Sequence, residues 1–148
     1  MNNKILKKIS NFFAKQEDIV AVYLYGSRAK EKETCKSDLD LAVLFRKPLT
    51  EYEKILELRV EIQKILGDAF FVDVREIHSG LSPVFLGEVI SSSKVVFCRD
   101  EAERIKFEVE AMRAIDDSEQ IRRINLYYLK KSLQQGSYGR TTSSTKIT

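Results

Sequence analysis

Asp38 and Asp40 are the two residues whose type and spacing most clearly indicate chemistry. The run from Asp38 to Phe45 has the apolar alternation of a strand, so residues two apart place both carboxylates on one face. Two carboxylates held side by side repel each other unless a positive charge lies between them. Because hard divalent cations such as Mg²⁺ take oxygen ligands, the pair is a candidate metal site.

Asp73 is a third acidic residue in an unusual place, since it interrupts the apolar run of residues 70–74. An ionised group in such a strand must be paired, bound to metal or turned to solvent. If this strand lies next to the one that carries Asp38 and Asp40, three carboxylates converge. Such an arrangement suits two metal ions about 3.5–4 Å apart, which hold the attacking and leaving oxygens of a phosphoryl displacement.

A phosphate site is indicated ahead of the acidic pair, where Gly26 ends an apolar run and Ser27 begins a polar one. Glycine lets the backbone approach a phosphate closely, and serine offers a hydroxyl and an N–H. If a helix starts here, its N-terminus adds N–H donors for an anion. Arg28 and Lys30 supply positive charge nearby. Each of these features alone is weak evidence for a nucleotide site, because it is common in proteins. Their combination at this spacing is much more specific.

The segment GSRAKEKETCKSDLDLAVLF resembles the GS-x10-D-x-D signature of minimal nucleotidyltransferase (MNT) domains of the DNA polymerase β superfamily. The chain length, the FVDV run with Asp73 and the Arg/Glu-rich region after Asp100 also look like the MntA-type antitoxins. Those antitoxins are paired with HEPN-domain ribonuclease toxins. The likeness covers about residues 15–130, and its diagnostic part is residues 26–40 together with Asp73.

The resemblance implies roles for these residues. Asp38 and Asp40 would bind two Mg²⁺ ions, Asp73 would complete the site and help activate the nucleophile, and the residues that hold the nucleotide phosphates would be Gly26, Ser27, Arg28 and Lys30. The implied reaction moves AMP from ATP to a tyrosine hydroxyl of the HEPN toxin, releases pyrophosphate and silences the toxin. A tyrosine hydroxyl of pKa about 10 needs a metal or carboxylate to lower the cost of deprotonation.

Glu31 departs from the pattern, because many members of the family have glycine at this position. A carboxylate near a triphosphate repels it, so this residue bears on nucleotide affinity. The three aspartates are intact and give no sign of an inactive enzyme.

Two other functions fit the same residues. One is transfer of a nucleotide to a small acceptor, as in aminoglycoside nucleotidyltransferases, although 148 residues leave no room for an added acceptor domain. The other is a non-catalytic protein that masks a toxin or binds nucleic acid through a basic C-terminal end. Residues 120–148 carry a net charge of +6, and the rest of the chain carries −3.

The elements that must position these residues form an α/β (α+β) domain, with a small mixed sheet, packed helices and C-terminal helices. This is the polymerase-β-like nucleotidyltransferase fold that the resemblance implies. We expect one domain over 1–135, with its core at about 15–98, C-terminal helices at about 100–135 and a disordered tail over 136–148. The predicted strands are Val20–Tyr25, Asp38–Phe45, Ala69–Ile77 and Lys94–Cys98, and the predicted helices are 3–16, 51–66, a short one from Ser82, one from Asp100 and one over 118–135.

Three local signals predict where helices begin and end. Thr50 and Glu53 have the spacing of a capping box, and Gly67 follows the last apolar position of the helix that they open. The triplet Asp116-Asp117-Ser118 interrupts an apolar stripe and predicts a break, with a new N-cap at Ser118. The last helix carries more apolar surface than one small sheet needs, which fits either a partner-binding face or packing on the sheet.

Composition excludes several other classes of protein. Hydrophobic residues make up 43% and charged residues 32%, an ordinary globular balance, and no apolar run approaches the roughly 18–20 residues of a membrane span. The N-terminal lysines interrupt any signal-peptide core, so we expect a cytoplasmic protein without membrane contact. Cys35 and Cys98 are too few and too far apart for a disulfide framework or a zinc site. The single histidine, His78, reads as a satisfied surface residue.

Overall fold

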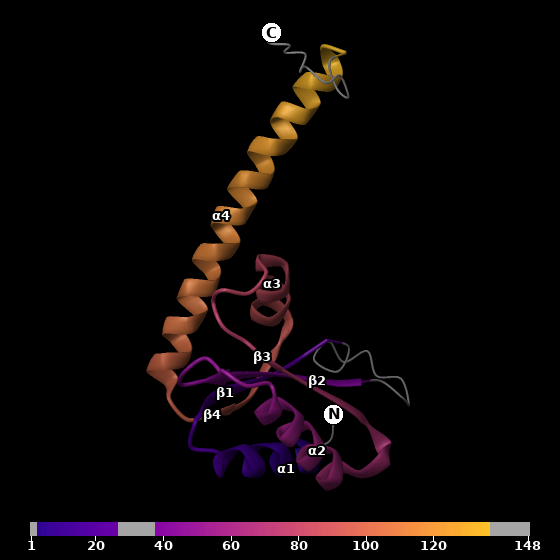
Figure 1. Cartoon of the computed structure of the whole chain (residues 1–148), viewed down its shortest axis with the longest axis vertical. Helices are drawn as coiled ribbons and strands as arrows, with labels where there is room; N and C mark the ends of the chain where they lie inside the picture. Colours follow the sequence, from indigo (N-terminus) through magenta and orange to yellow (C-terminus); the bar gives the residue numbers. More distant parts are fainter. Residues whose placement is uncertain (1–2, 27–37, 137–148) are drawn as a thin grey trace. The chain divides into compact units, whose positions relative to one another are not determined.

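The computed structural model describes residues 3–26 and 38–136. In these residues four strands form one mixed sheet: β1 (Ile19–Tyr25), β2 (Asp38–Phe45), β3 (Phe71–Glu76) and β4 (Lys94–Cys98). Their order is β3-β2-β1-β4, and β1 is antiparallel to both β2 and β4 (Figure 1). β2 and β3 are parallel, with α2 (Glu53–Leu66) as their crossover. The predicted α/β fold class with a small mixed sheet is therefore confirmed.

Helices cover both faces of the sheet. α1 (Asn3–Ala14) and α2 lie on one face, and α3 (Pro83–Ser92) lies on the other (Figure 1). The first turns of α4 (Glu101–Gln134) share the face of α3, because Phe107 and Ala111 belong to the same buried cluster as Leu86 and Val89. Each face thus has its own apolar core.

The alternation of β2 decides which side chains enter which core. Leu39, Leu41 and Val43 are buried in the cluster beneath α1 and α2. Ala42 and Leu44 are buried in the cluster beneath α3 and α4. Because successive side chains of a strand point to opposite faces, Asp38 and Asp40 share one face, as the sequence predicted, and that face is the one covered by α3.

The beginning of α2 differs from the prediction. The helix starts at Glu53, its N-cap is Tyr52, and no side chain caps it, so the expected capping box of Thr50 and Glu53 is wrong. The backbone N–H of Leu49 instead donates to Glu76 Oε2 at 2.8 Å, so a side chain of β3 holds the loop. The other end is as predicted, since Gly67 adopts φ +74° at the C-cap. One short 3-10 turn, Gly67–Ala69, then delays the start of β3 to Phe71.

The predicted break at Asp116-Asp117-Ser118 is also wrong, because α4 is one helix from Glu101 to Gln134. Aspartate and serine cost only a few tenths of a kcal/mol relative to alanine inside a helix, less than a second costly nucleation. The N-cap is Asp100, whose Oδ1 accepts the N–H of Glu103 at 3.1 Å.

Residues up to 115 and those from 116 onward form two compact units, and each is described by itself. The first contains the sheet and both apolar cores. No helix in the described residues is long and apolar enough to span a bilayer. Residues 137–148, most of the predicted tail, lie outside the described residues.

Candidate active site

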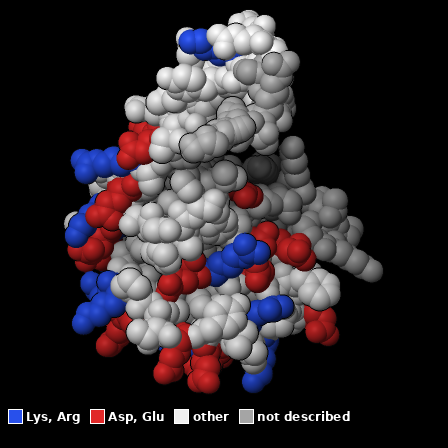
Figure 2. Space-filling model, turned by 45° about the horizontal axis from the view of Figure 1, so that its top comes forward, with Lys and Arg blue, Asp and Glu red and all other residues white. Residues whose placement is uncertain are grey.

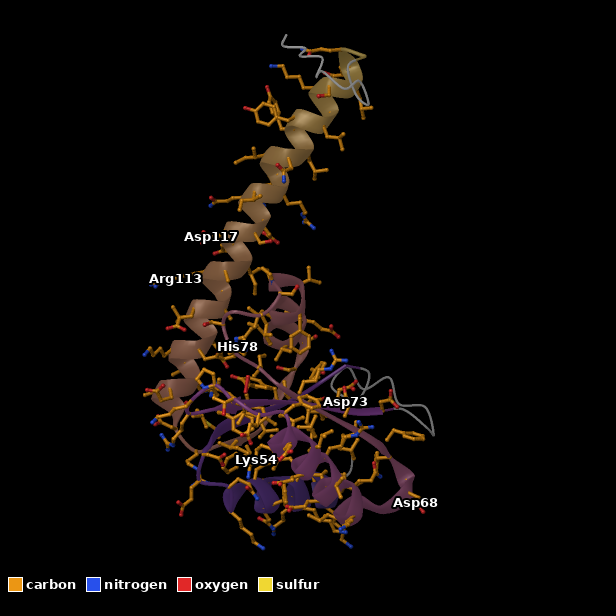
Figure 3. The ribbon with its side chains drawn as sticks, in the orientation of Figure 1. Lys54, Asp68, Asp73, His78, Arg113 and Asp117 are labelled. Carbon is orange, nitrogen blue, oxygen red and sulfur yellow. The ribbon has the colours of Figure 1, made fainter. Side chains whose placement is uncertain are left out.

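The parallel pairing of β2 and β3 brings the acidic residues together. Asp40 is the register partner of Asp73, and Asp38 is the partner of Phe71 at the start of β3. Asp73 projects from β3 in Figure 3, half-buried, and Asp38 is exposed. The three carboxylates were expected to converge if the strand of Asp73 lay next to the strand of Asp38 and Asp40. The two strands are adjacent.

The electrostatics of Asp40 reflect this crowding. Burial raises the pKa of the Asp40 carboxyl above its ordinary value, and the charges of Asp73 and Asp38 raise it further. Arg75 opposes the shift. The two neighbouring carboxylates therefore leave a concentration of negative charge that Arg75 offsets only in part.

Gly26 is fitted to Asp40. It has φ +78°, a conformation that L side chains rarely adopt, and a Cβ placed on it would lie 2.5 Å from Asp40 Oδ2. The preceding residue, Tyr25, is the register partner of Asp40 on the neighbouring strand. The sequence predicted that this glycine binds the nucleotide phosphates. The structure adds that only glycine at this position leaves room for the Asp40 carboxylate.

Arg75 is a site residue that sequence reasoning missed. Its Nε donates to Asp73 Oδ2 at 3.1 Å, and its guanidinium lies 5.8 Å from the ring centroid of Phe85 on α3. Because it follows Asp73 by two residues in a strand, period-two alternation alone would have placed both side chains on one face. Arg75 therefore supplies positive charge to both Asp73 and Asp40.

Tyr25 on β1 lies next to the acidic residues and Arg75. Its ring packs edge-on against Phe85 with centroids 5.5 Å apart. Burial raises the pKa of Tyr25 to about 12; Arg75 opposes this shift, and Asp40 and Asp73 add to it. The tyrosine therefore stays neutral beside the acidic residues at ordinary pH.

The donor set fits a hard divalent cation, since it consists of carboxylate oxygens on one face with unbalanced negative charge at Asp40. In residues 3–26 and 38–136 no three acidic, histidine or cysteine side chains already enclose a common point. Asp73 instead pairs with Arg75. Asp38, Asp40 and Asp73 are the residues that would hold the ion.

Some of the other residues singled out in the sequence lie outside the described part of the chain, and others lie within it. Ser27, Arg28 and Lys30, together with Glu31, lie outside the described residues. His78 follows β3, and its Nδ1 accepts the N–H of Gly80 at 3.2 Å, in agreement with its prediction as a satisfied histidine. Cys98 carries a free thiol.

Residues 7–102 match the family described as polymerase beta, nucleotidyltransferase. The chain belongs to this family. A search of curated proteins finds no significant match.

Solved structures show the same fold over nearly the whole length of their matching chains. One is a toxin–antitoxin with AMP-PNP, with 20% identity and a TM-score of 0.69, covering 84% of this chain and 98% of that one. A second is the tri-AMPylated Shewanella oneidensis HEPN toxin in complex with MNT antitoxin, with 19% identity and a TM-score of 0.66, covering 88% and 99%. A third is the toxin–antitoxin MntA–HepT, with 18% identity and a TM-score of 0.60, covering 89% and 99%.

Proposed function

We propose that this chain is an antitoxin that transfers AMP from ATP to a tyrosine of a HEPN ribonuclease toxin and so neutralises it. The observation that carries the proposal is the register of Asp40 with Asp73 on adjacent strands, with Gly26 packed against the Asp40 carboxylate. The family match supports nucleotidyl transfer. The likeness to chains of toxin–antitoxin complexes, one with AMP-PNP and one with an AMPylated HEPN toxin, supports ATP as donor and a protein as acceptor.

The roles of the residues follow from their chemistry. Asp38, Asp40 and Asp73 would hold Mg²⁺, which when bound supplies positive charge to the phosphates and lowers the cost of ionising the nucleophile. The N–H groups of Gly26 and Ser27, with the side chains of Arg28 and Lys30, would hold the triphosphate. Tyr25 and Phe85, whose rings are in contact, would border the acidic group.

The proposed transfer balances as one displacement at phosphorus. The acceptor tyrosine Oη bonds to the α-phosphorus of ATP, and the bond from that phosphorus to the bridging oxygen of the β-phosphate breaks. Pyrophosphate leaves with the bond electrons. The phenolic proton passes to a carboxylate oxygen of Asp73, whose side chain is 37% exposed and pairs with Arg75.

The test uses ATP labelled on the α-phosphate, Mg²⁺ and a purified HEPN-domain protein from the source cell. Wild type is run beside Asp40→Asn and the matched control Asp68→Asn, an exposed aspartate in the 3-10 turn after α2. We expect label on the HEPN protein with wild type and Asp68→Asn, and a loss on the order of 100-fold with Asp40→Asn, because the substitution removes charge from the reacting centre.

The other outcomes separate the remaining functions. Equal labelling by Asp40→Asn would show that the site assignment is wrong. Label on a small molecule, when a lysate of the source cell replaces the purified protein, would favour the small-acceptor transferase. Neutralisation of the toxin by Asp40→Asn without label would favour a masking protein.

A further inference from the structure

The last turns of α4 expose an unusual amount of apolar surface. Every residue from 119 to 131 is exposed. Seven large apolar or aromatic side chains of residues 119–133 are between 38% and 61% exposed: Ile121, Ile124, Leu126, Tyr127, Tyr128, Leu129 and Leu133. Single exposed apolar residues are common, but a contiguous set on one helix marks an interaction site.

Six of these side chains follow two stripes with the same spacing, and Tyr127 lies in neither stripe. The first stripe is Ile121, Ile124 and Tyr128, and the second stripe is Leu126, Leu129 and Leu133. Each follows the i, i+3, i+7 positions of one helix face. At about 100° per residue, the two stripes lie roughly 140° apart around the helix. A face this wide exceeds what a flat contact buries, and it fits a groove that contacts the helix on two sides.

The charge of the segment is of one sign. From Gln120 to Gln134 the helix carries Arg122, Arg123, Lys130 and Lys131 and no acidic residue. Lys131 borders the first stripe, Lys130 and Arg123 lie beyond the second, and Arg122 extends the second stripe one turn before Leu126. Figure 2 shows the different situation on the sheet and its helices, where acidic and basic side chains are interspersed.

We propose that residues 120–134 of α4 dock into an apolar, acidic-rimmed groove of the protein acceptor. This inference rests on the proposed function, since the acceptor is the toxin of that proposal. The charge of the helix argues against the other possible partners, which are a second copy of the helix, residues 137–148 and RNA. A second copy of the helix would set four cations against four others, which is unfavourable. Residues 137–148 add two more cations, and Tyr138 and Ile147 are their only large apolar residues. RNA would use the cations and leave both apolar stripes in water.

The docking variant is Ile124→Gln with Leu129→Gln, one change in each stripe. Glutamine is a good helix former, and both side chains are exposed, so folding does not depend on them. The matched control is Leu56→Gln on α2, where the leucine is 44% exposed. A second variant, Lys130→Glu with Lys131→Glu, reverses two of the cations that flank the stripes and is called the rim variant. Binding to the purified HEPN protein is measured by calorimetry at two salt concentrations, and transfer is measured with labelled ATP.

We expect the stripe variant to bind about tenfold more weakly or worse, with ATP affinity unchanged, and Leu56→Gln to behave as wild type. The rim variant should lose the salt dependence of binding and associate more slowly. Asp40→Asn should show the reverse pattern, with binding kept and transfer lost. Wild type that binds through the stripes but never transfers would refute the proposed function and leave the docking surface standing.

Three results would overturn the docking proposal. The first is wild-type affinity in the stripe variant, with transfer intact. The second is a dimer of the free chain in sedimentation that the stripe variant converts to monomer, which would assign the stripes to a second copy. The third is binding of a single-stranded RNA oligonucleotide that is lost in the rim variant and kept in the stripe variant.

Discussion

Gly26 and Asp40 fit together so closely that a Cβ on the glycine would lie 2.5 Å from Asp40 Oδ2. The two residues come from neighbouring antiparallel strands, since Tyr25 is the register partner of Asp40. The conformation of Gly26, at φ +78°, is a second reason for glycine at this position. The glycine thus shapes the acidic site as well as any phosphate site beside it.

Gly26→Ala should therefore reduce both stability and transfer. The backbone strain costs about 1–3 kcal/mol, and the methyl group displaces the Asp40 carboxylate. Gly67→Ala is the matched control, because Gly67 has φ +74° and nothing lies within 4 Å of its added Cβ. Urea unfolding should show a loss in both variants, and labelled transfer should fall further only in Gly26→Ala. Equal transfer per folded molecule in the two variants would refute the role of this contact.

Arg75→Gln should strengthen divalent-cation binding. The guanidinium holds Asp73 at 3.1 Å, so its removal frees a carboxylate oxygen and deletes a competing positive charge. At this exposed position the charge is worth about 1 kcal/mol, or roughly a fivefold tighter Mn²⁺ affinity. Mn²⁺ titration followed by electron paramagnetic resonance measures this, with Arg59→Gln on α2 as control. Unchanged or weaker Mn²⁺ binding would contradict the competition between Arg75 and the ion.

Tyr23 makes stability depend on alkaline pH. Its hydroxyl donates to Glu108 Oε1 at 2.8 Å, and burial, together with Glu108, raises the pKa of Tyr23 well above its ordinary value. A raised folded-state pKa gives stability that is fully present below pH 10 and lost as the pH rises above it. Tyr25, with its pKa raised to about 12, adds a loss between pH 10 and 12.

Tyr23→Phe should cost about 1 kcal/mol at pH 8, because Glu108 keeps its bond to Arg104 Nη1 at 2.8 Å. Above pH 10 the variant should lose stability less steeply than wild type, since only Tyr25 still contributes. Urea unfolding between pH 8 and pH 11.5 measures both effects. Parallel pH curves for the two proteins would show that Tyr23 does not titrate as proposed.

Asp100 caps α4, whereas Thr50 does not cap α2, so removing the two side chains should affect stability differently. Asp100→Ala removes the bond from Glu103 N–H to Oδ1 and the 3.5 Å ion pair with Arg46, and should cost about 1 kcal/mol. Asp100→Asn keeps the cap and should lose only a few tenths of a kcal/mol. Thr50→Ala should change little, because no side chain caps α2. A loss with Thr50→Ala as large as that with Asp100→Ala, measured by thermal unfolding, would restore the capping box.

Local patterns in the sequence determined most of the elements. The alternation in β2 placed Leu39 and Asp40 on opposite faces, and the structure agrees. The apolar steps in α1 and the glycine after α2 were equally informative. These features depend on side chains a few residues apart, so the sequence carries them directly. The local signals that failed, at Thr50 and at Asp116, are each worth only a few tenths of a kcal/mol to about one, so helix cooperativity and loop contacts override them.

The site itself depended on contacts between residues far apart in the chain. The sequence supplied Asp38, Asp40 and Asp73, but the parallel pairing of β2 with β3 decided that Asp40 lies beside Asp73. The pairing of Arg75 with Asp73 and the fit of Gly26 to Asp40 likewise exist only in the folded chain. Strand pairing closes long loops, and its energy comes from the whole sheet and its two cores, which no window of sequence contains.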